Sequence, residues 1–162
     1  MTHRYDGLMA RRGRAAVALL VAALLGSAQA PGAAAPAAAA RPAPPAIVAE
    51  LGAAIEAARR RFEARDRAGV LAAVSDRYRS AGLTKAAVGD QLSAIFALYQ
   101  ELRARITIDR VEMVGAGARV YTTGEVTGRL PLVGWVIVLA WQGEPEVARR
   151  EAAGWRLFGF QD

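Results

Sequence analysis

Carboxylates and tyrosines are the side chains of this sequence best suited to acid–base chemistry. The chain has no cysteine, and its one histidine is His3, which lies in an N-terminal leader. A thiol nucleophile and a histidine base are therefore missing from the remainder of the chain. An aspartate base and a tyrosine donor could still enolise a ketone, provided that burial raises the pKa of the carboxyl group toward the working pH.

The obvious pair in the predicted domain is Asp76 and Tyr78, two residues apart in a polar segment that spans 75–82. Another interpretation is structural, because an aspartate in a turn commonly caps backbone N–H groups and a tyrosine there commonly fills the end of a core. Asp90 and Glu125 fall on polar faces, where we expect solvent or an arginine partner. Tyr99 falls on an apolar stripe, where a core position is expected.

Other kinds of site find no support in the sequence. No cluster of acidic residues has the spacing of a calcium loop, so we expect no metal. Gly115 and Gly117 lie in a predicted hairpin rather than before a helix, which argues against a phosphate-binding loop. No serine sits in a nucleophile elbow. We therefore expect neither a metal nor a cofactor.

The first part of the predicted domain has the apolar periodicity of helices, and these helices must position the candidate residues. Apolar residues recur at steps of three and four, which predicts a first helix over about 46–67 and a short second one over 70–74. Thr84 is a suitable N-cap for a third helix. The predicted stripes consist of Ile47, Leu51, Ile55, Ala58 and Phe62 in the first helix, and Val88, Leu92, Ile95, Phe96 and Tyr99 in the third.

Beyond Arg103 the apolar period changes to two, which indicates strands. The phase reverses near Asp109 and Arg110, as a β-bulge would require. Predicted strands cover 106–113, 118–129, 135–141, 146–151 and 155–160. The expected fold class is α+β, with three N-terminal helices packed on a strongly bent antiparallel sheet of about five strands.

The N-terminal residues have the organisation of an export signal. Four arginines precede an apolar run over 15–25, and small residues at 26–28 suit a signal peptidase. We expect a signal peptide over 1–28, a disordered Ala/Pro-rich linker over 29–46 and a domain over 47–162. The alternative is an uncleaved membrane anchor.

Cleavage of this leader would give a periplasmic or secreted protein that is free of the membrane. The absence of cysteine also removes the attachment point of a lipid anchor. The whole chain has 21 basic and 15 acidic residues, but the basic excess lies largely in the leader and the remaining charges are interspersed. Nucleic-acid binding is therefore not expected.

Three segments of the domain resemble the nuclear transport factor 2-like superfamily, and in particular its exported bacterial members of unknown function. The segments are FEARDRAGVLAAV at 62–74, DRYRSAGLTK at 76–85 and REAAGWRLFGFQD at 150–162. The resemblance covers essentially all of 47–162. It implies a cone-shaped, cystatin-like fold whose helices close over a concave sheet and leave an apolar pocket at the open end.

The resemblance also bears on function. Enzymes of this superfamily, such as ketosteroid isomerases, scytalone dehydratase and polyketide cyclases, place Asp, Tyr or His inside the cone. This sequence departs from the His-dependent members, since its only histidine is His3. The expected function is therefore non-catalytic binding of a small apolar ligand, or of a partner peptide, inside the cone.

Two alternatives remain open. One is a cofactor-free isomerase or dehydratase of the ketosteroid-isomerase type that uses Asp76 and Tyr78. The other is a membrane-anchored periplasmic docking domain of a larger assembly. The expected pocket wall consists of Phe62, Tyr78, Phe96, Tyr99, Trp135 and Trp155. The two tryptophans depend on strand register, because a shift of one residue would turn them to the other face.

The strand at 135–141 also predicts an assembly. It is apolar on both faces, yet the sequence offers helices to cover only one of them. An exposed apolar sheet face commonly marks an interface. We therefore expect a homodimer that forms through the sheet.

Overall fold

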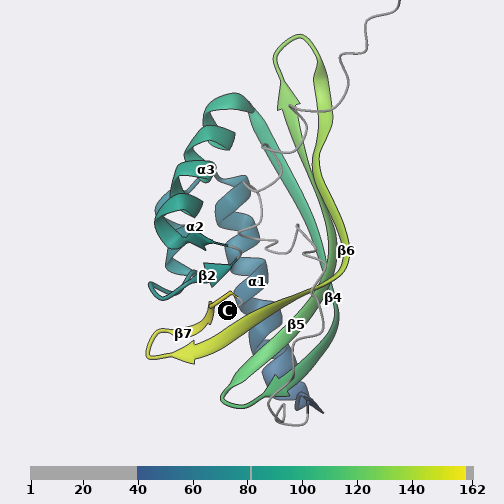
Figure 1. Cartoon of the computed structure of the whole chain (residues 1–162). Coiled ribbons are helices and arrows are strands. Elements are labelled where there is room, and N and C mark those ends of the chain that lie inside the picture. Colours follow the sequence, from purple (N-terminus) through teal and green to yellow (C-terminus); the bar gives the residue numbers. More distant parts are fainter. Residues whose placement is uncertain (1–39, 81, 160–162) are drawn as a thin grey trace, which may run out of the picture.

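The computed structural model describes residues 40–80 and 82–159, and they form an α+β fold with three helices on one face of a curved sheet (Figure 1). The helices begin at residue 45, after the predicted leader and near the end of the predicted linker, rather than at the start of the chain. They are α1 (Pro45–Glu63), α2 (Arg67–Ala72) and α3 (Lys85–Leu98). Among the described residues, no helix combines the length and apolar character needed to cross a bilayer.

The main sheet has five antiparallel strands in the order β1-β4-β5-β6-β7, and β2 pairs with β3 in a separate small hairpin. The strands are β1 (Arg41–Pro42), β2 (Arg79–Ser80), β3 (Leu83–Thr84), β4 (Glu101–Val114), β5 (Gly117–Leu130), β6 (Gly134–Glu151) and β7 (Gly154–Leu157). The predicted bulge is confirmed, because the pairing of β4 with β5 shifts between Ile108 and Arg110.

The helices begin and end where local side chains provide caps. Thr84 accepts a hydrogen bond from the backbone N–H of Ala87 at the start of α3, as predicted. Asp66 accepts from the N–H of Gly69 and thereby caps α2. The first helix ends at Glu63, earlier than expected, because Arg65 has a positive φ of 59° that cannot continue a helix.

The predicted linker requires one correction. Arg41 pairs with Met113 and Pro42 with Glu112, so the end of the supposed linker forms an edge strand of the sheet. The N–H of Ala43 donates to the carbonyl of Val111 at 3.0 Å, which carries this pairing up to α1. Pro45 then begins α1, a position that needs no N–H donor. The predicted signal peptide lies outside the described residues.

A second correction concerns β6, which is one strand of 18 residues rather than two strands joined by a turn. Gly143, Glu144 and Pro145 do not reverse the chain. Instead, the pairing with β5 shifts between Thr122 and Gly124, and the strand bends there and continues. As a result, β6 runs along the whole sheet in Figure 1.

Two groups of buried side chains fill the space between the helices and the sheet. The first cluster joins α2, α3 and the end of α1 to the middle of β5 and β6, and includes Phe62, Tyr78, Phe96 and Trp141. The second cluster joins α1 to the far halves of β4, β5 and β6, and includes Leu51, Val120 and Ala148.

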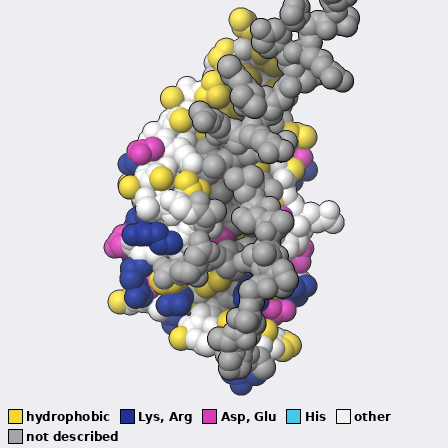
Figure 2. Space-filling model, in the orientation of Figure 1, with side chains coloured by type: hydrophobic (Ala, Val, Ile, Leu, Met, Phe, Trp, Pro, Cys, Tyr) yellow, Lys and Arg dark blue, Asp and Glu magenta, His cyan; other side chains and the backbone are white. Residues whose placement is uncertain are grey.

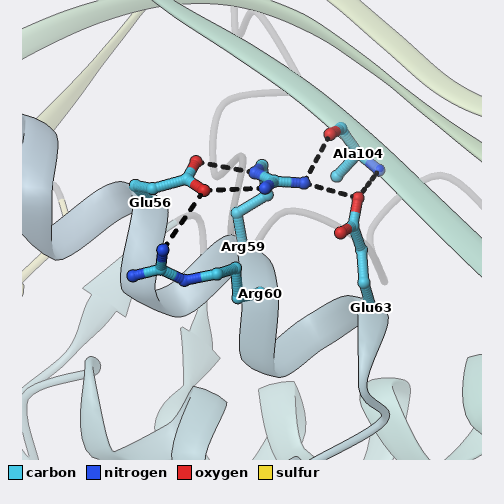
Figure 3. A network of polar contacts seen from close by, with 5 residues as sticks. All are labelled: Glu56, Arg59, Arg60, Glu63 and Ala104. Carbon is cyan, nitrogen blue, oxygen red and sulfur yellow. Dashed lines mark hydrogen bonds and ion pairs between the residues drawn. The ribbon is translucent and has the colours of Figure 1, made fainter.

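A polar network fastens α1 to the edge of β4 (Figure 3). Arg59 donates to both carboxylate oxygens of Glu56 at 2.7 Å and forms an ion pair with Glu63 at 2.7 Å. Arg59 also donates to the carbonyl of Ala104 at 3.5 Å, and Glu63 accepts from the N–H of Ala104 at 2.9 Å. The network therefore satisfies backbone groups at a strand edge that would otherwise be free to pair with another chain.

Replacing Arg59 by methionine should lower the free energy of unfolding by about 1 kcal/mol, because it removes the bonds to Ala104 and leaves Glu63 without its partner. The matched control is Arg60→Met. Arg60 is exposed and forms a long ion pair with Glu56, at 3.9 Å, so we expect its replacement to change stability by less than about 0.5 kcal/mol. Urea denaturation measures both, and equal losses would contradict a specific role for Arg59.

Candidate functional site

The structure separates Asp76 from Tyr78, the pair that the sequence singled out. The side chain of Asp76 is 84% exposed and accepts a hydrogen bond from Lys85 Nζ at 2.7 Å. This hydrogen bond, together with the positive charge of Lys85, lowers the pKa of Asp76. Tyr78 is buried in the first cluster. Residues 75–78 form a tight turn in which the N–H of Tyr78 donates to the carbonyl of Ser75 at 3.0 Å, so Tyr78 enters the core while Asp76 faces the surroundings.

A different carboxylate, Glu146, lies inside the molecule. Only 8% of this residue is exposed, and neither of its side-chain oxygens has a hydrogen-bond partner among the described residues. Burial raises the pKa of Glu146 well above its usual range, because a charged carboxylate loses its hydration in the interior. The carboxyl group therefore favours the protonated form, which can donate one hydrogen bond and accept others.

The strand β6 places Glu146 on the face that is directed toward the helices. Glu146 pairs with Val120 of β5, and Ala148 pairs with Ala118. Val120, Ala118 and Ala148 are all buried in the second cluster. Trp141 belongs to the first cluster, so Glu146 lies along β6 between the two clusters.

Tyr78 is the titratable neighbour of Glu146. Burial is the main cause that raises the pKa of Tyr78, and the negative charge of ionised Glu146 adds to it, while a hydrogen bond with the Ser80 side chain opposes the rise. The Tyr78 hydroxyl is therefore a neutral donor at any ordinary pH. Glu146 and Tyr78 together form a pair of neutral, hydrogen-bonding groups in an apolar interior.

The backbone around Tyr78 is hydrogen-bonded to the end of β7 and to the residue that follows it. The N–H of Ser75 donates to the carbonyl of Leu157 at 2.8 Å, and the N–H of Arg79 donates to that of Phe158 at 3.2 Å. Gly159 has a φ of 76°, and a Cβ there would lie less than 3.0 Å from the Arg79 carbonyl oxygen. Only glycine permits this close approach, which fixes the position of the tyrosine.

Aromatic side chains dominate the first cluster, to which Tyr78 belongs. The rings of Phe62 and Phe96 have centroids 5.6 Å apart. Trp141 donates its indole N–H to Thr122 Oγ1 at 3.1 Å and lies over Gly124. The ring of Tyr99 lies over Gly128 in the same way. Glycines in β5 thus provide the room for large side chains on the concave face.

The two tryptophans of the predicted wall lie elsewhere. Trp155 packs against the second cluster and donates its indole N–H to Glu50 at 2.9 Å. Trp135 is 40% exposed and lies beneath the guanidinium of Arg103, 4.1 Å from the ring centroid. Trp135 pairs with Arg129, which is exposed, so the tryptophan belongs to the outer face of the sheet. The cause is a register shift between Val126 and Thr127, which reverses the phase of β6.

Sequence reasoning missed Glu146 because Gly143 and Pro145 resemble a turn. If the chain turned there, the preceding strand would not determine which of the following residues face the core. A glutamate in such a segment is then expected to face solvent. A signal was nevertheless present in the partner strand. Ala118 and Val120 are apolar at alternate positions, and a strand paired with them must direct its own alternate residues to the same buried face.

Among the other polar groups of the described residues, Gln91 Oε1 is also buried without a hydrogen-bond partner, but an amide does not ionise. No group of three or more His, Asp or Glu side chains within 40–80 and 82–159 could hold a metal ion. Asp90 is exposed on α3, and Glu125 lies opposite Arg105 in the sheet. The chemistry available in the interior is therefore hydrogen bonding and proton transfer by Glu146 and Tyr78.

Comparison with known proteins agrees on the fold. No family model and no curated protein matches the sequence. Among solved structures, a scytalone dehydratase-like protein from Novosphingobium aromaticivorans is 10% identical, with a TM-score of 0.62 over 70% of this chain and 80% of that one.

Two further structures agree with it. A dehydratase of the nuclear transport factor 2-like family from Streptomyces avermitilis is 17% identical, with a TM-score of 0.55 over 72% of this chain and 94% of that one. A ketosteroid isomerase-like protein from Erwinia carotovora atroseptica is 21% identical, with a TM-score of 0.52 over 68% and 90%. The chain therefore has the nuclear transport factor 2-like fold, as its sequence motifs indicated.

Proposed function

We propose that this domain binds a small, largely apolar molecule that carries a hydroxyl or carbonyl group, and that Glu146 and Tyr78 contact that group. The observation that carries the proposal is the buried carboxyl of Glu146, whose two oxygens lack partners among the described residues. A buried polar group without a hydrogen bond costs free energy, so its retention needs an explanation. A ligand with one polar group would satisfy the carboxyl, and Phe62, Phe96 and Trp141 would cover its apolar body.

The proposal is tested by titrating the purified protein with 2-naphthol, with 2-methylnaphthalene as a probe of similar shape without a hydroxyl. We expect the wild type to bind 2-naphthol roughly fivefold more tightly than the hydrocarbon, since one hydrogen bond is worth about 1 kcal/mol. Glu146→Leu should remove this preference and keep binding of the hydrocarbon. Equal affinities in the wild type, or no binding of either probe, would contradict the proposal.

A second candidate is acid–base catalysis, which the raised pKa of Glu146 beside Tyr78 favours. Proteins of similar fold include ones named as dehydratases and an isomerase-like protein. Because Asp76 is exposed, the carboxylate role would pass to Glu146. Ionised Glu146 would take the α-proton of a β,γ-unsaturated ketone, which gives a dienolate, while the Tyr78 hydroxyl donates to the carbonyl oxygen. The electron pair of the broken C–H bond forms the dienolate, and Glu146 returns the proton at the γ-carbon.

This candidate predicts turnover of a β,γ-unsaturated cyclic ketone, followed by the absorbance of the conjugated product. Glu146→Gln should abolish turnover while it preserves the fold, and Tyr78→Phe should slow it by roughly a hundredfold. If the wild type bound the ketone without converting it, the catalytic role would be excluded and the binding role would stand.

A further inference from the structure

The exposed large apolar side chains of the described residues gather at one end of the molecule. One is Leu98, at the end of α3, and the others belong to the β5–β6 hairpin; they are Leu132, Val133, Trp135 and Ile137. The N–H of Gln100 donates to the carbonyl of Arg129 at 2.9 Å, which joins the end of α3 to the base of the hairpin. We call the five side chains the apolar end, and yellow side chains gather there in Figure 2.

The apex of the hairpin is unusual for a turn. Turns commonly contain Gly, Asn or Asp, yet this one reads Leu130-Pro131-Leu132-Val133. Leu132 is fully exposed and has a φ of 66°, a region that costs a residue with a Cβ about 1 kcal/mol or more. The turn therefore holds Leu132 in an unfavourable backbone conformation while its apolar side chain is exposed. Figure 1 shows the hairpin extending past the helices.

Basic side chains surround the base of this hairpin. Arg103 lies over the ring of Trp135, Arg129 forms an ion pair with Glu101 at 2.5 Å, and Arg65 donates to the carbonyl of Gln100 at 3.3 Å. We call Arg65, Arg103 and Arg129 the arginine collar. One glutamate opposes its three charges in these contacts, so the collar carries a net positive charge.

We propose that the apolar end docks on a lipid bilayer with anionic headgroups. Leu132 and Val133 enter the boundary of the acyl chains, Trp135 lies at the level of the headgroups, and the arginine collar faces the lipid phosphates. Tryptophan prefers this depth, and each arginine near an anionic surface adds to the affinity. The arrangement has the apolar apex and basic surround of a peripheral membrane anchor.

The shape of the apolar end favours a bilayer over a second copy of the chain. A specific protein interface covers about 800 Å² on each partner and requires a matching surface. The apex of a hairpin is narrow and convex, and a fluid bilayer accepts such a projection without a preformed pocket. A homodimer through the outer face of the sheet is the competing occupant, and the experiment distinguishes the two.

The test uses the full chain, whose lack of cysteine allows a single label. Leu132→Cys carries an environment-sensitive nitrobenzoxadiazole dye at the apex. The matched control is Ala152→Cys, an exposed position in the turn between β6 and β7 at the opposite end. Vesicles of phosphatidylcholine with phosphatidylglycerol should shift the Leu132→Cys emission to the blue, and nitroxides on the acyl chains should quench it. The label at 152 should not respond.

Two substitutions sharpen the result. Val133→Ser in the Leu132→Cys chain should lower the vesicle affinity reported by the dye by roughly tenfold, because it removes one apolar side chain from the bilayer. Arg103→Glu should weaken binding to anionic vesicles and leave the weaker binding to phosphatidylcholine unchanged.

Three outcomes would overturn the proposal. The first is a label at 132 that ignores every vesicle. The second is an equal response at both positions, which would assign the binding to another part of the chain. The third is a blue shift without vesicles that grows with protein concentration, which would identify a second copy as the occupant.

Discussion

The free energy of unfolding should fall as the pH rises above about 4.5 in the wild type, and this fall should disappear in Glu146→Leu. Burial raises the pKa of Glu146 in the folded state, so the folded protein holds this proton more tightly than the unfolded chain does. The stabilising contribution of the bound proton is complete below the unfolded pKa. It is lost as the pH rises toward the folded pKa, by up to about 1.4 kcal/mol per pH unit.

Glu146→Leu should also be more stable than the wild type at pH 5, by about 1 to 3 kcal/mol, because it removes a buried polar group that has no partner among the described residues. The difference between the two proteins should grow between pH 5 and pH 8 by the amount that the wild type loses. Urea denaturation at several pH values, followed by tryptophan fluorescence, measures both effects. A wild type whose stability rises over this range would contradict the burial of a neutral carboxyl.

Asp76→Asn is the matched control for this experiment. The pKa of Asp76 is lowered by Lys85, so its contribution has the opposite sign. That contribution is present above the ordinary pKa of 3.8 and is lost as the pH falls below it. Replacing Asp76 should therefore leave the dependence between pH 5 and pH 8 unchanged.

Gly124→Ala should lower the free energy of unfolding by about 3 kcal/mol, the effect of overpacking at a rigid position. A Cβ at residue 124 would lie less than 3.0 Å from the Trp141 indole and from the Arg105 carbonyl oxygen. The indole would have to move, which would break its hydrogen bond to Thr122. The carbonyl belongs to the neighbouring strand and cannot yield without disturbing the pairing.

The same substitution at Gly52 provides a comparison of opposite sign. Gly52 lies within α1, and a Cβ there would meet only Ile108 Cδ1, at 3.8 Å. Gly52→Ala should therefore stabilise the protein by about 0.5 to 1 kcal/mol through helix propensity. Thermal unfolding followed by near-ultraviolet circular dichroism measures the stability of each variant and also reports on the packing of the Trp141 indole. If both variants were equally stable, the close packing over Gly124 would be disproved.

The elements that the sequence predicted correctly are those defined by local patterns. The apolar stripes of α1 and α3, the cap at Thr84 and the phase reversal near Arg110 each depend on residues within a few positions of one another. The burial of Phe62, Tyr78 and Phe96 follows from the same stripes and from the segment that precedes α3. These signals are short-range, so a single sequence contains them.

The errors concentrate in β6, where the geometry depends on a partner strand. Residues 135–141 are apolar at almost every position, so no alternation sets which face is inward. The two register shifts against β5 decide that Trp135 is outside and Glu146 inside. Neither shift has a local signature, because Gly143 and Pro145 fit a turn as readily as a bend. The sequence left the placement of Asp76 open for a related reason, since its partner Lys85 lies beyond the β2–β3 hairpin.

The continuity of β6 has a consequence for how the molecule opens. One strand contributes Trp141 to the first cluster and Ala148 to the second, and no loop separates them. Disruption of either cluster would therefore also weaken the pairing of β6 with β5 beside the other cluster. The central amide protons of β6 and β5 should exchange with deuterium as a single group, at the rate of global unfolding, and the two halves of the interior should behave as one cooperative unit.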